Sequence, residues 1–380
     1  MKVLERIVVV GNSTAGITVA NKLRTRIAKD DAEVILIAGG NRHYFNDASV
    51  FLPINYLQSS YLSAPVKSLL KKSIVHINEN IKSIDIENSG VLTEEGHLIR
   101  YTYLVLAMDC VPDPDAIPGF KEEARSVDEV QSTISLREDI QNLKQGSIVI
   151  GNAPNFKGNQ ILASDLAILL SKYFREKKLD SKIKIQVFFP EEKIHGSTEL
   201  FNWVETELKA NNIEMIGGFS LASLNVKNRE LVSSEGKTIK YDLPVVMPPE
   251  SLHKSILSSN IPKVENGQID IDESTLSIKN QEQIYLIGGS LGIPGSQNIY
   301  SALDQAEFVS ARIANKISGY MGPGQFKMKI ELHPITDDKL AISATVDGDS
   351  LQLGKASETD FLLRLYAHSS YFGREIRGFV

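Results

Sequence analysis

The residues best suited to hold a ligand form one short loop near the start of the chain, where Gly11 and Gly16 enclose Ser13, Thr14 and Ala15. The spacing follows the pattern G-x-G-x-x-G, with a serine in the middle place. In that pattern the glycines let the backbone approach a pyrophosphate, which backbone N–H groups and the positive end of a helix then bind. The loop therefore predicts a dinucleotide-binding turn.

The segments around this loop predict the elements that would position it. The apolar run 6–10 indicates a buried parallel strand, and a helix with an apolar face follows the loop. A second apolar run at 34–38 completes a βαβ unit of about thirty residues. The pattern requires an acidic residue at the end of that second strand for the ribose hydroxyls. Gly40 and Asn41 stand there, so we expect only an uncharged hydrogen bond from Asn41.

Two later stretches repeat this architecture. A strand at 147–154, a helix to about residue 177 and a strand at 183–190 predict a second βαβ unit, preceded by a helix at 127–143. Proline-rich segments separate this unit from the first, and a last strand at 283–289 ends in a glycine turn. The sequence thus predicts an α/β fold with two Rossmann-like, three-layer domains, the second inserted in the first. The expected boundaries are 1–115 with 270–320, then 116–269, and a small C-terminal region at 321–380.

Composition excludes several classes of function. The 380 residues carry a formal net charge of −6 without a basic block, which argues against nucleic acid as a partner. The seven histidines are scattered without ligand spacing, so we expect no metal. Cys110 is the single cysteine, which excludes an intrachain cysteine pair, and we expect it to be a small buried residue. No apolar run reaches transmembrane length, so the expected location is the cytoplasm or the cytoplasmic face of a membrane.

The end of the chain is amphipathic. The segment 361–366 is largely apolar, and Arg364, Arg374 and Arg377 lie in or after it. One interpretation is a terminal helix that docks on the core or on an identical or homologous subunit. The other is a helix that lies on a membrane surface as a peripheral contact.

The order of these parts resembles the FAD-dependent pyridine nucleotide-disulfide oxidoreductase superfamily, above all sulfide:quinone oxidoreductases and type II NADH dehydrogenases. The resemblance lies in the two interleaved nucleotide folds, the strand 101–107 before the proline-rich crossover, and the late turn after residue 284. It implies FAD as cofactor, with Ala107 at the crossover and Gly289 and Ser290 at the late turn beside it.

The groups that anchor FAD in that superfamily are changed at several positions here. The late-turn Gly-Asp pair reads Gly288-Gly289, and the Ala-Thr-Gly of the crossover ends in Asp109. An Asp109 carboxylate that faced a phosphate would repel it. A lost charge-assisted hydrogen bond is worth roughly 1.5–3 kcal/mol, so several losses together predict that FAD is bound weakly or not at all. Restoring the acid with Gly289→Asp should then raise FAD affinity.

Three hypotheses for function remain at this point. The first is a flavin-dependent oxidoreductase that does not oxidise sulfide, because the segments that would hold the redox cysteines contain none. The second is a non-catalytic relative that acts as a binding or structural subunit. The third is a nucleotide site in the second domain alone, at 151–158, although Pro154 lacks the N–H that a phosphate would accept from. No residue is expected to act as a catalytic acid, base or nucleophile.

Overall fold

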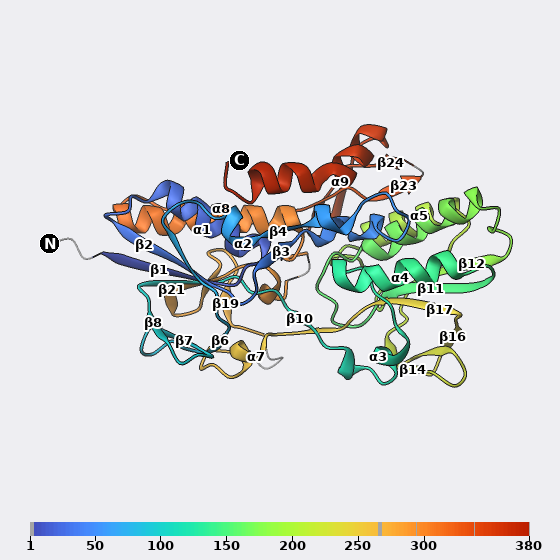
Figure 1. Ribbon diagram of the computed structural model, residues 1–380, viewed down its shortest axis with the longest axis horizontal. Coiled ribbons are helices and arrows are strands. Elements are labelled where there is room, and N and C mark those ends of the chain that lie inside the picture. The colour runs from blue at the N-terminus through green and yellow to red at the C-terminus, as the bar shows by residue number, and fades with distance from the viewer. Residues whose placement is uncertain (1–3, 265–267, 294, 338, 380) are drawn as a thin grey trace.

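The structure is a computed structural model that describes residues 4–264, 268–293, 295–337 and 339–379. Two lobes lie side by side along its long axis, and each has strands covered by helices (Figure 1). The C-terminal helix, in red, lies above the junction between them (Figure 1).

The first lobe is built on a seven-stranded sheet whose centre is the βαβ unit predicted from the sequence. β1 (Glu5–Val10) pairs in parallel with β2 (Ala32–Ile37) on one side and with β9 (Tyr103–Leu106) on the other. The sheet continues with β5 (Ile74–Ile77) beside β2 and with β21 (Gln281–Leu286), β20 (Ser277–Ile278) and β19 (Ile271–Asp272) beyond β9. Strands distant in the sequence therefore share one sheet, as expected for a domain that a second one interrupts.

Two helices pack against each other over this sheet, α1 (Thr14–Arg26) and α8 (Ile299–Ser318). The last four residues of β1 are buried because the sheet is covered on both faces. The turn from β1 into α1 is tight. A Cβ on Gly16 would lie 2.1 Å from the carbonyl oxygen of Gly11, and one on Gly11 would lie 2.3 Å from that of Ala107. Packing of strand against helix thus requires glycine at both positions.

The second lobe holds the second predicted unit as a four-stranded parallel sheet. Its strands, in order, are β13 (Glu214–Ile216), β12 (Ile183–Phe188), β11 (Gly146–Asn152) and β17 (Leu243–Met247). Its helices are α4 (Val130–Asn142), α5 (Leu162–Glu176) and α6 (Thr198–Ala210). The predicted helix at 127–143 thus begins three residues later than expected, because Arg125 bridges to β17 and residues 127–129 form a bend before the helix.

The chain crosses between the lobes in both directions at one place, where β10 (Val111–Pro112) pairs antiparallel with β18 (Glu250–Ser251). The remaining small elements are β3 (Arg42–Tyr44) with β4 (Ser63–Pro65); β6 (Ile81–Asp85), β7 (Gly90–Thr93) and β8 (Leu98–Arg100); β14 (Leu221–Asn225), β15 (Glu230–Ser233) and β16 (Thr238–Lys240); and the helices α2 (Val66–Leu69), α3 (Phe120–Glu123) and α7 (Lys254–Leu257).

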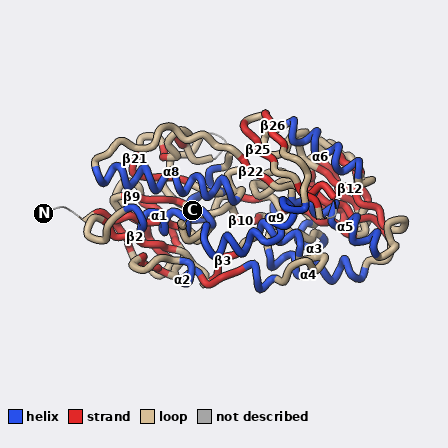
Figure 2. The backbone as a smooth tube through the Cα atoms, turned by 90° about the horizontal axis from the view of Figure 1, so that it is seen from above, coloured by secondary structure: helices blue, strands red, loops and turns tan. Residues whose placement is uncertain are grey.

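The C-terminal region combines short strands with one helix. The strands are β22 (Ile330–Leu332), β23 (Ile335–Asp337), β24 (Leu340–Ala341), β25 (Ala344–Asp347) and β26 (Ser350–Leu353). α9 (Glu358–Ser370) follows and runs into a π-helical turn at Tyr371–Glu375. Seen from above, α9 lies between the two lobes, and the chain end lies over α1 (Figure 2). Within the described ranges, no helix has both the length and the apolar character needed to cross a membrane.

Candidate nucleotide-binding site

Two cavities meet at the carboxyl ends of β1 and β9, between the first lobe and the crossover strands. The first has a volume of about 150 Å³ and lies between the loop after β2, the late turn and the second lobe. The second, of about 220 Å³, follows the glycine-rich loop towards the ends of β2 and β5. Asp109 and Cys110 line both cavities. Ligands of open α/β sheets bind at such a carboxyl edge, so this is the candidate site.

The glycine-rich loop lies where the sequence predicted it, at the start of α1. Ser13 is the N-cap of the helix, since its Oγ accepts the N–H of Gly16 at 3.2 Å and donates to the carbonyl oxygen of Ala107 at 2.6 Å. Thr14 and Ala15 line the first cavity, and Ser13 lines the second. The serine that replaces the middle glycine therefore stabilises the turn and takes one N–H group that an anion would otherwise accept from.

The backbone N–H groups of the late turn, after β21, also have hydrogen-bond acceptors within the chain. The N–H of Gly289 donates to Oδ1 of Asp109 at 3.4 Å, and the N–H of Ser290 donates to the carbonyl oxygen of Met108 at 3.3 Å. A Cβ on Gly289 would lie 2.6 Å from the side chain of Gln297. Gln297 thus occupies the space into which a side chain at position 289 would extend.

The other residues that the sequence analysis selected lie beside the cavities or further away. Gly40 has a positive φ of 91°, and Oδ1 of Asn41 accepts the side-chain N–H of Asn78 at 2.9 Å rather than facing a cavity-lining group. Ala107 is fully buried under the loop, where its carbonyl oxygen binds Ser13. Glu79, which follows β5, lines the second cavity. Sequence reasoning missed Glu79 because it sought the acid after β2, while β5 is the neighbouring strand.

Asp109 is the residue that changes the chemistry of the site. Its Oδ1 would lie 3.5 Å from a Cβ on Gly288, a point that is also 3.5 Å from Cβ of Ala15 and 3.8 Å from Oγ of Ser13. The carboxylate therefore sits beside the first turn of α1, between the two cavities. Burial raises the pKa of Asp109 to about 6, against the opposing effect of the Gly289 N–H.

The first cavity is acidic around this point. Its described lining includes no lysine or arginine, and its carboxyl groups besides Asp109 belong to Asp47, Asp128, Glu129 and Glu250. Burial raises the pKa of each of these four groups, to about 7 for Glu250. In their ionised form these groups disfavour an anionic ligand.

Glu250 joins the two lobes within this lining. Its Oε2 accepts the backbone N–H of Lys157 from the second lobe at 2.5 Å and a side-chain N–H of Gln297 from the first at 3.4 Å. It lies on the crossover strand β18, directly after the prolines that end β17. The carboxyl end of a buried strand was the only sequence signal that pointed to it.

Thr14 and His43, which form another wall of the first cavity, are hydrogen-bonded to Tyr371 in the C-terminal turn. Nδ1–H of His43 donates to the carbonyl oxygen of Asn12 at 2.8 Å, and burial lowers the pKa of His43 to about 4, so the ring is neutral. Its Nε2 is then an acceptor, and the hydroxyl of Tyr371 donates to it at 2.5 Å. The hydroxyl of Thr14 in turn donates to Tyr371 at 2.9 Å.

Cys110 differs from its expected role as a fully buried residue. It is partly exposed, since it lies where the two cavities meet, and burial raises the pKa of its thiol to about 12. A thiol with a raised pKa is a poor nucleophile. In the part of the chain that the structure describes, no cluster of three or more His, Cys, Asp or Glu residues is arranged to hold a metal ion.

The start of α1, beside both cavities, is where the pyrophosphate of a dinucleotide binds in folds of this kind. There it would meet the buried carboxylate of Asp109 and no cationic side chain in the described lining of either cavity. Two unit charges about 4 Å apart repel by roughly 4 kcal/mol at an effective dielectric constant of about 20. An ionised Asp109 therefore opposes the binding of a pyrophosphate at this point.

Comparison with known proteins agrees with the fold. A mitochondrial sulfide:quinone oxidoreductase of Dictyostelium discoideum is 21% identical over 328 residues, which cover 83% of this chain and 72% of that protein. The sulfide:quinone oxidoreductase structure of Aquifex aeolicus superposes with a TM-score of 0.83 at 19% identity, over 98% of this chain and 92% of that one. A chain of the Tetrahymena thermophila mitochondrial ATP synthase superposes with a TM-score of 0.81 at 13% identity, over 98% and 96%.

The family profile described as pyridine nucleotide-disulphide oxidoreductase matches residues 5–306, which span both sheets and the late turn. The two interleaved sheets, each with a core of parallel strands, and the glycine-rich turn into α1 are the features expected of that family. The chain therefore belongs to the pyridine nucleotide-disulphide oxidoreductase family.

Proposed function

We propose that this protein is a non-catalytic member of its family, which binds FAD weakly or not at all and acts as a binding or structural subunit. One observation carries the proposal: the carboxylate of Asp109 lies between the two cavities, where the pyrophosphate of a dinucleotide would connect them. The chain also satisfies the Gly289 and Ser290 N–H groups internally. With one cysteine of raised pKa, it lacks the pair that a sulfide oxidation through cysteines requires.

A non-catalytic role is compatible with this fold. One structural neighbour at 13% identity is a chain of a mitochondrial ATP synthase assembly, so a protein of this shape also occurs as part of a large complex. A fold of this kind carries no function by itself, and the site decides it. We infer that the partners of this chain include identical or homologous subunits. Such subunits would bind its protein surface, and their binding would not depend on a flavin.

The visible absorption spectrum of the purified protein tests the proposal first. We expect a colourless preparation, and a calorimetric titration with FAD at pH 7.5 should show weak binding or none. Asp109→Asn keeps the shape of the side chain and its acceptor oxygen for Gly289 but removes the charge. This variant should bind FAD at least tenfold more tightly, since each 1.4 kcal/mol of relieved repulsion is a factor of ten.

The exposed Asp30 provides the matched control, because Asp30→Asn removes an equal charge away from both cavities and should leave FAD binding unchanged. Lowering the pH from 7.5 to 5 should strengthen FAD binding to the wild type, since protonation of Asp109, with its pKa near 6, removes the same charge. The Asp109→Asn variant should lose most of this pH dependence. A yellow wild-type protein with stoichiometric FAD would contradict the proposal.

A flavin-dependent oxidoreductase is the second candidate, and the observation that favours it is the pair of connected cavities along the start of α1. If the protein binds FAD, its flavin would do the chemistry and the chain would orient it. Bleaching of a reconstituted flavin by NADH would support this candidate. Bleaching by sulfide is not expected under either candidate, because the chain has a single cysteine and not a redox pair.

A further inference from the structure

The C-terminal segment 358–379 connects the two lobes by side-chain contacts at both of its ends. α9 lies over the junction in two perpendicular views, and the turn after it reaches α1 of the first lobe (Figures 1 and 2). Several of its side chains are buried rather than laid on the surface, including Phe361, Arg364 and Tyr371.

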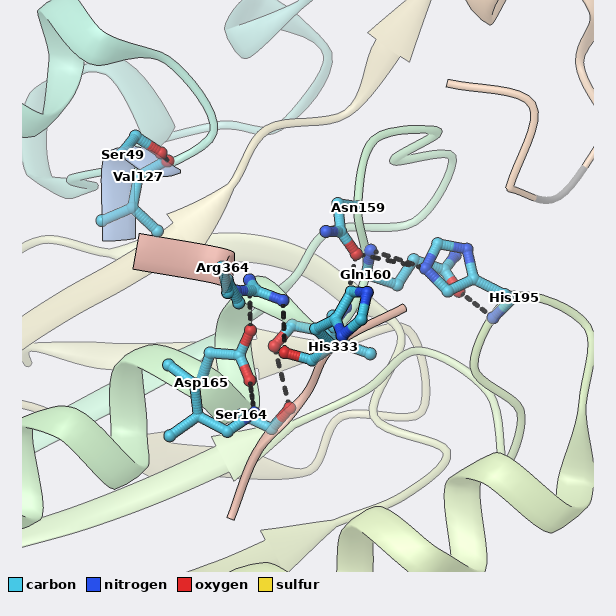
Figure 3. Close-up of polar contacts among 11 residues, drawn as sticks. Ser49, Val127, Asn159, Gln160, Ser164, Asp165, His195, His333 and Arg364 are labelled. Atoms are coloured by element: carbon cyan, nitrogen blue, oxygen red, sulfur yellow. Dashed lines mark hydrogen bonds and ion pairs between the residues drawn. The ribbon is translucent and has the colours of Figure 1, made fainter. Parts of the chain in front are cut away.

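The contact with the second lobe is a buried ion pair. Nη2 of Arg364 lies 2.5 Å from Oδ2 of Asp165 on α5, and their side chains are 9% and 0% exposed. Figure 3 shows the two groups facing each other, with Nη1 of Arg364 also directed at His333, whose carbonyl oxygen accepts its hydrogen bond at 2.9 Å. Oδ1 of Asp165 accepts the N–H of Ile335 at 2.8 Å. Removing one member of such a pair leaves a buried charge without its partner, so the contact resists opening.

The contact with the first lobe is a directed chain of hydrogen bonds. Thr14 donates to Tyr371, Tyr371 donates to His43, and His43 donates to the carbonyl oxygen of Asn12 in the glycine-rich loop. The ring of Tyr371 packs on Phe45 with 4.7 Å between centroids. Beyond it, the side chain of Asn21 on α1 donates to the carbonyl oxygen of Ile376 at 2.9 Å.

Every member of this chain except Tyr371 lines one of the two cavities. Thr14 and His43 form part of the wall of the first, and Asn12 part of the wall of the second. We propose that the segment 358–379 is a strap that holds the glycine-rich loop and the cavity wall of the first lobe against the second lobe, so that its release loosens the cleft. Tyr371 is the positioning residue through which the strap acts.

The inference rests on the proposed function only in taking this cleft as the ligand site, and it adds what holds the wall of that site in place. A group that displaces α9 when it binds the outer face of that helix would act on the cleft through the strap, since the two sites would then be coupled. The coupling can be measured without any ligand.

The first test compares Tyr371→Phe with Tyr366→Phe by hydrogen–deuterium exchange of the ligand-free protein. Both variants lose one phenolic hydroxyl from the same segment, but Tyr366 is 56% exposed whereas Tyr371 is buried. Tyr371→Phe keeps the packing on Phe45 and breaks the chain of hydrogen bonds. It should speed exchange roughly tenfold in residues 11–17 and 41–48 as well as in the strap, and Tyr366→Phe should not.

The second test breaks the opposite contact. Asp165→Asn combined with Arg364→Met removes both charges, which avoids leaving one of them buried alone. The strap proposal expects faster exchange in residues 11–17, which neither side chain touches. Exchange that rises only in α9 and α5, or does not rise at all, overturns the proposal. If the double variant unfolds as a whole, the comparison of the two tyrosine variants decides, and an unchanged glycine-rich loop in Tyr371→Phe also overturns it.

The two proposals can fail separately. Exchange is measured on the ligand-free protein, so a tightly bound FAD would contradict the proposed function and leave the strap intact. Conversely, unchanged exchange in residues 11–17 of both Tyr371→Phe and the Asp165→Asn, Arg364→Met double variant would overturn the strap proposal. The FAD titrations would still test the proposed function.

Discussion

Burial of carboxyl groups without cationic partners is the main electrostatic feature of the site at the residue scale. Asp109, Glu250 and Asp165 each have a pKa raised by burial, to about 6, 7 and 6. Arg364 opposes that effect at Asp165, but the described lining of the first cavity offers no such cation to Asp109 and Glu250. The negative charges of these two groups therefore cost stability at neutral pH.

Glu250 gives the first residue-scale prediction, which concerns stability against pH. Its pKa in the folded protein is about 7 against 4.5, so the folded state holds the proton more tightly than the unfolded state. The free energy of unfolding contributed by this group is therefore full below pH 4.5 and is lost as the pH rises through 7. Glu250→Gln keeps the acceptor for Lys157 and should be more stable than wild type at pH 8, by about 1–3 kcal/mol.

Urea denaturation of both proteins at pH 5 and pH 8 measures the difference. The variant should lose part of the decrease in stability that the wild type shows between the two values. Glu205→Gln, at an exposed position of α6, should follow the wild type. Equal pH dependence in Glu250→Gln and wild type would mean that Glu250 is not held protonated by its surroundings.

Gly289 gives the second prediction, and here the structure changes the expectation drawn from the sequence. A carboxylate introduced by Gly289→Asp would need Gln297 to move and would stand beside Asp109, whose Oδ1 accepts the Gly289 N–H. The negative charges of the new aspartate and of Asp109 would repel each other. We therefore expect no gain in FAD affinity from Gly289→Asp alone, and a gain only when Asp109→Asn is added.

Calorimetric titration with FAD of the two single variants and the double variant measures this coupling as a double-mutant cycle. The interaction term should be favourable in the double variant. Additive effects would show that the two positions act independently, and a gain from Gly289→Asp alone would restore the simpler interpretation of the late turn.

At the scale of elements, α9 presents one face to the core and an apolar face outwards. Leu362, Leu363 and Tyr366 are 49%, 58% and 56% exposed, while Phe361 and Arg364 on the other side are buried. Phe379, at the end of the tail, is 65% exposed and lies against Lys71, whose Nζ is 4.5 Å from the ring centroid. The helix therefore docks on the core with one face. Its outer face exposes apolar side chains, which is the property that suggested a membrane contact.

Peripheral membrane contact stays a prediction, and it can be tested without removing the buried part of the tail. Leu362→Glu with Leu363→Glu places charges only on the exposed face. If that face lies on a membrane, the double variant should lose most of its co-sedimentation with phosphatidylglycerol vesicles while keeping its unfolding temperature. Val226→Glu, at another exposed apolar position, serves as the control. Equal sedimentation of wild type and double variant would remove this prediction.

At the scale of the whole molecule, sequence patterns predicted the architecture well because they report burial. The continuous apolar runs of β1, β2, β9, β11 and β21 mark strands covered on both faces, and the glycine-rich loop marks the turn into α1. Helix boundaries were less predictable. α4 begins at Val130 rather than 127, because Arg125 pairs with β17 before the helix starts.

The candidate site was predictable only in part. The loop residues that line it follow from a local pattern, whereas Glu250, Glu79 and Tyr371 reach it from segments far away in the sequence. Tyr371 lies 357 residues after Thr14, and the periodic patterns that predict helices and strands do not predict a contact over such a separation. The charge of the cavity is likewise a sum over distant segments, so it becomes visible only in the folded chain.

The closeness of Gly16 to Gly11 has a consequence for how such chains are recognised. Because a methyl group at either position would collide with a carbonyl oxygen, the fold alone enforces the motif, with or without a ligand. The presence of these two glycines in a sequence therefore indicates the close contact between strand and helix, and does not by itself indicate a bound nucleotide. In this chain we therefore expect the charge of Asp109, the third residue after β9, to decide whether a dinucleotide binds.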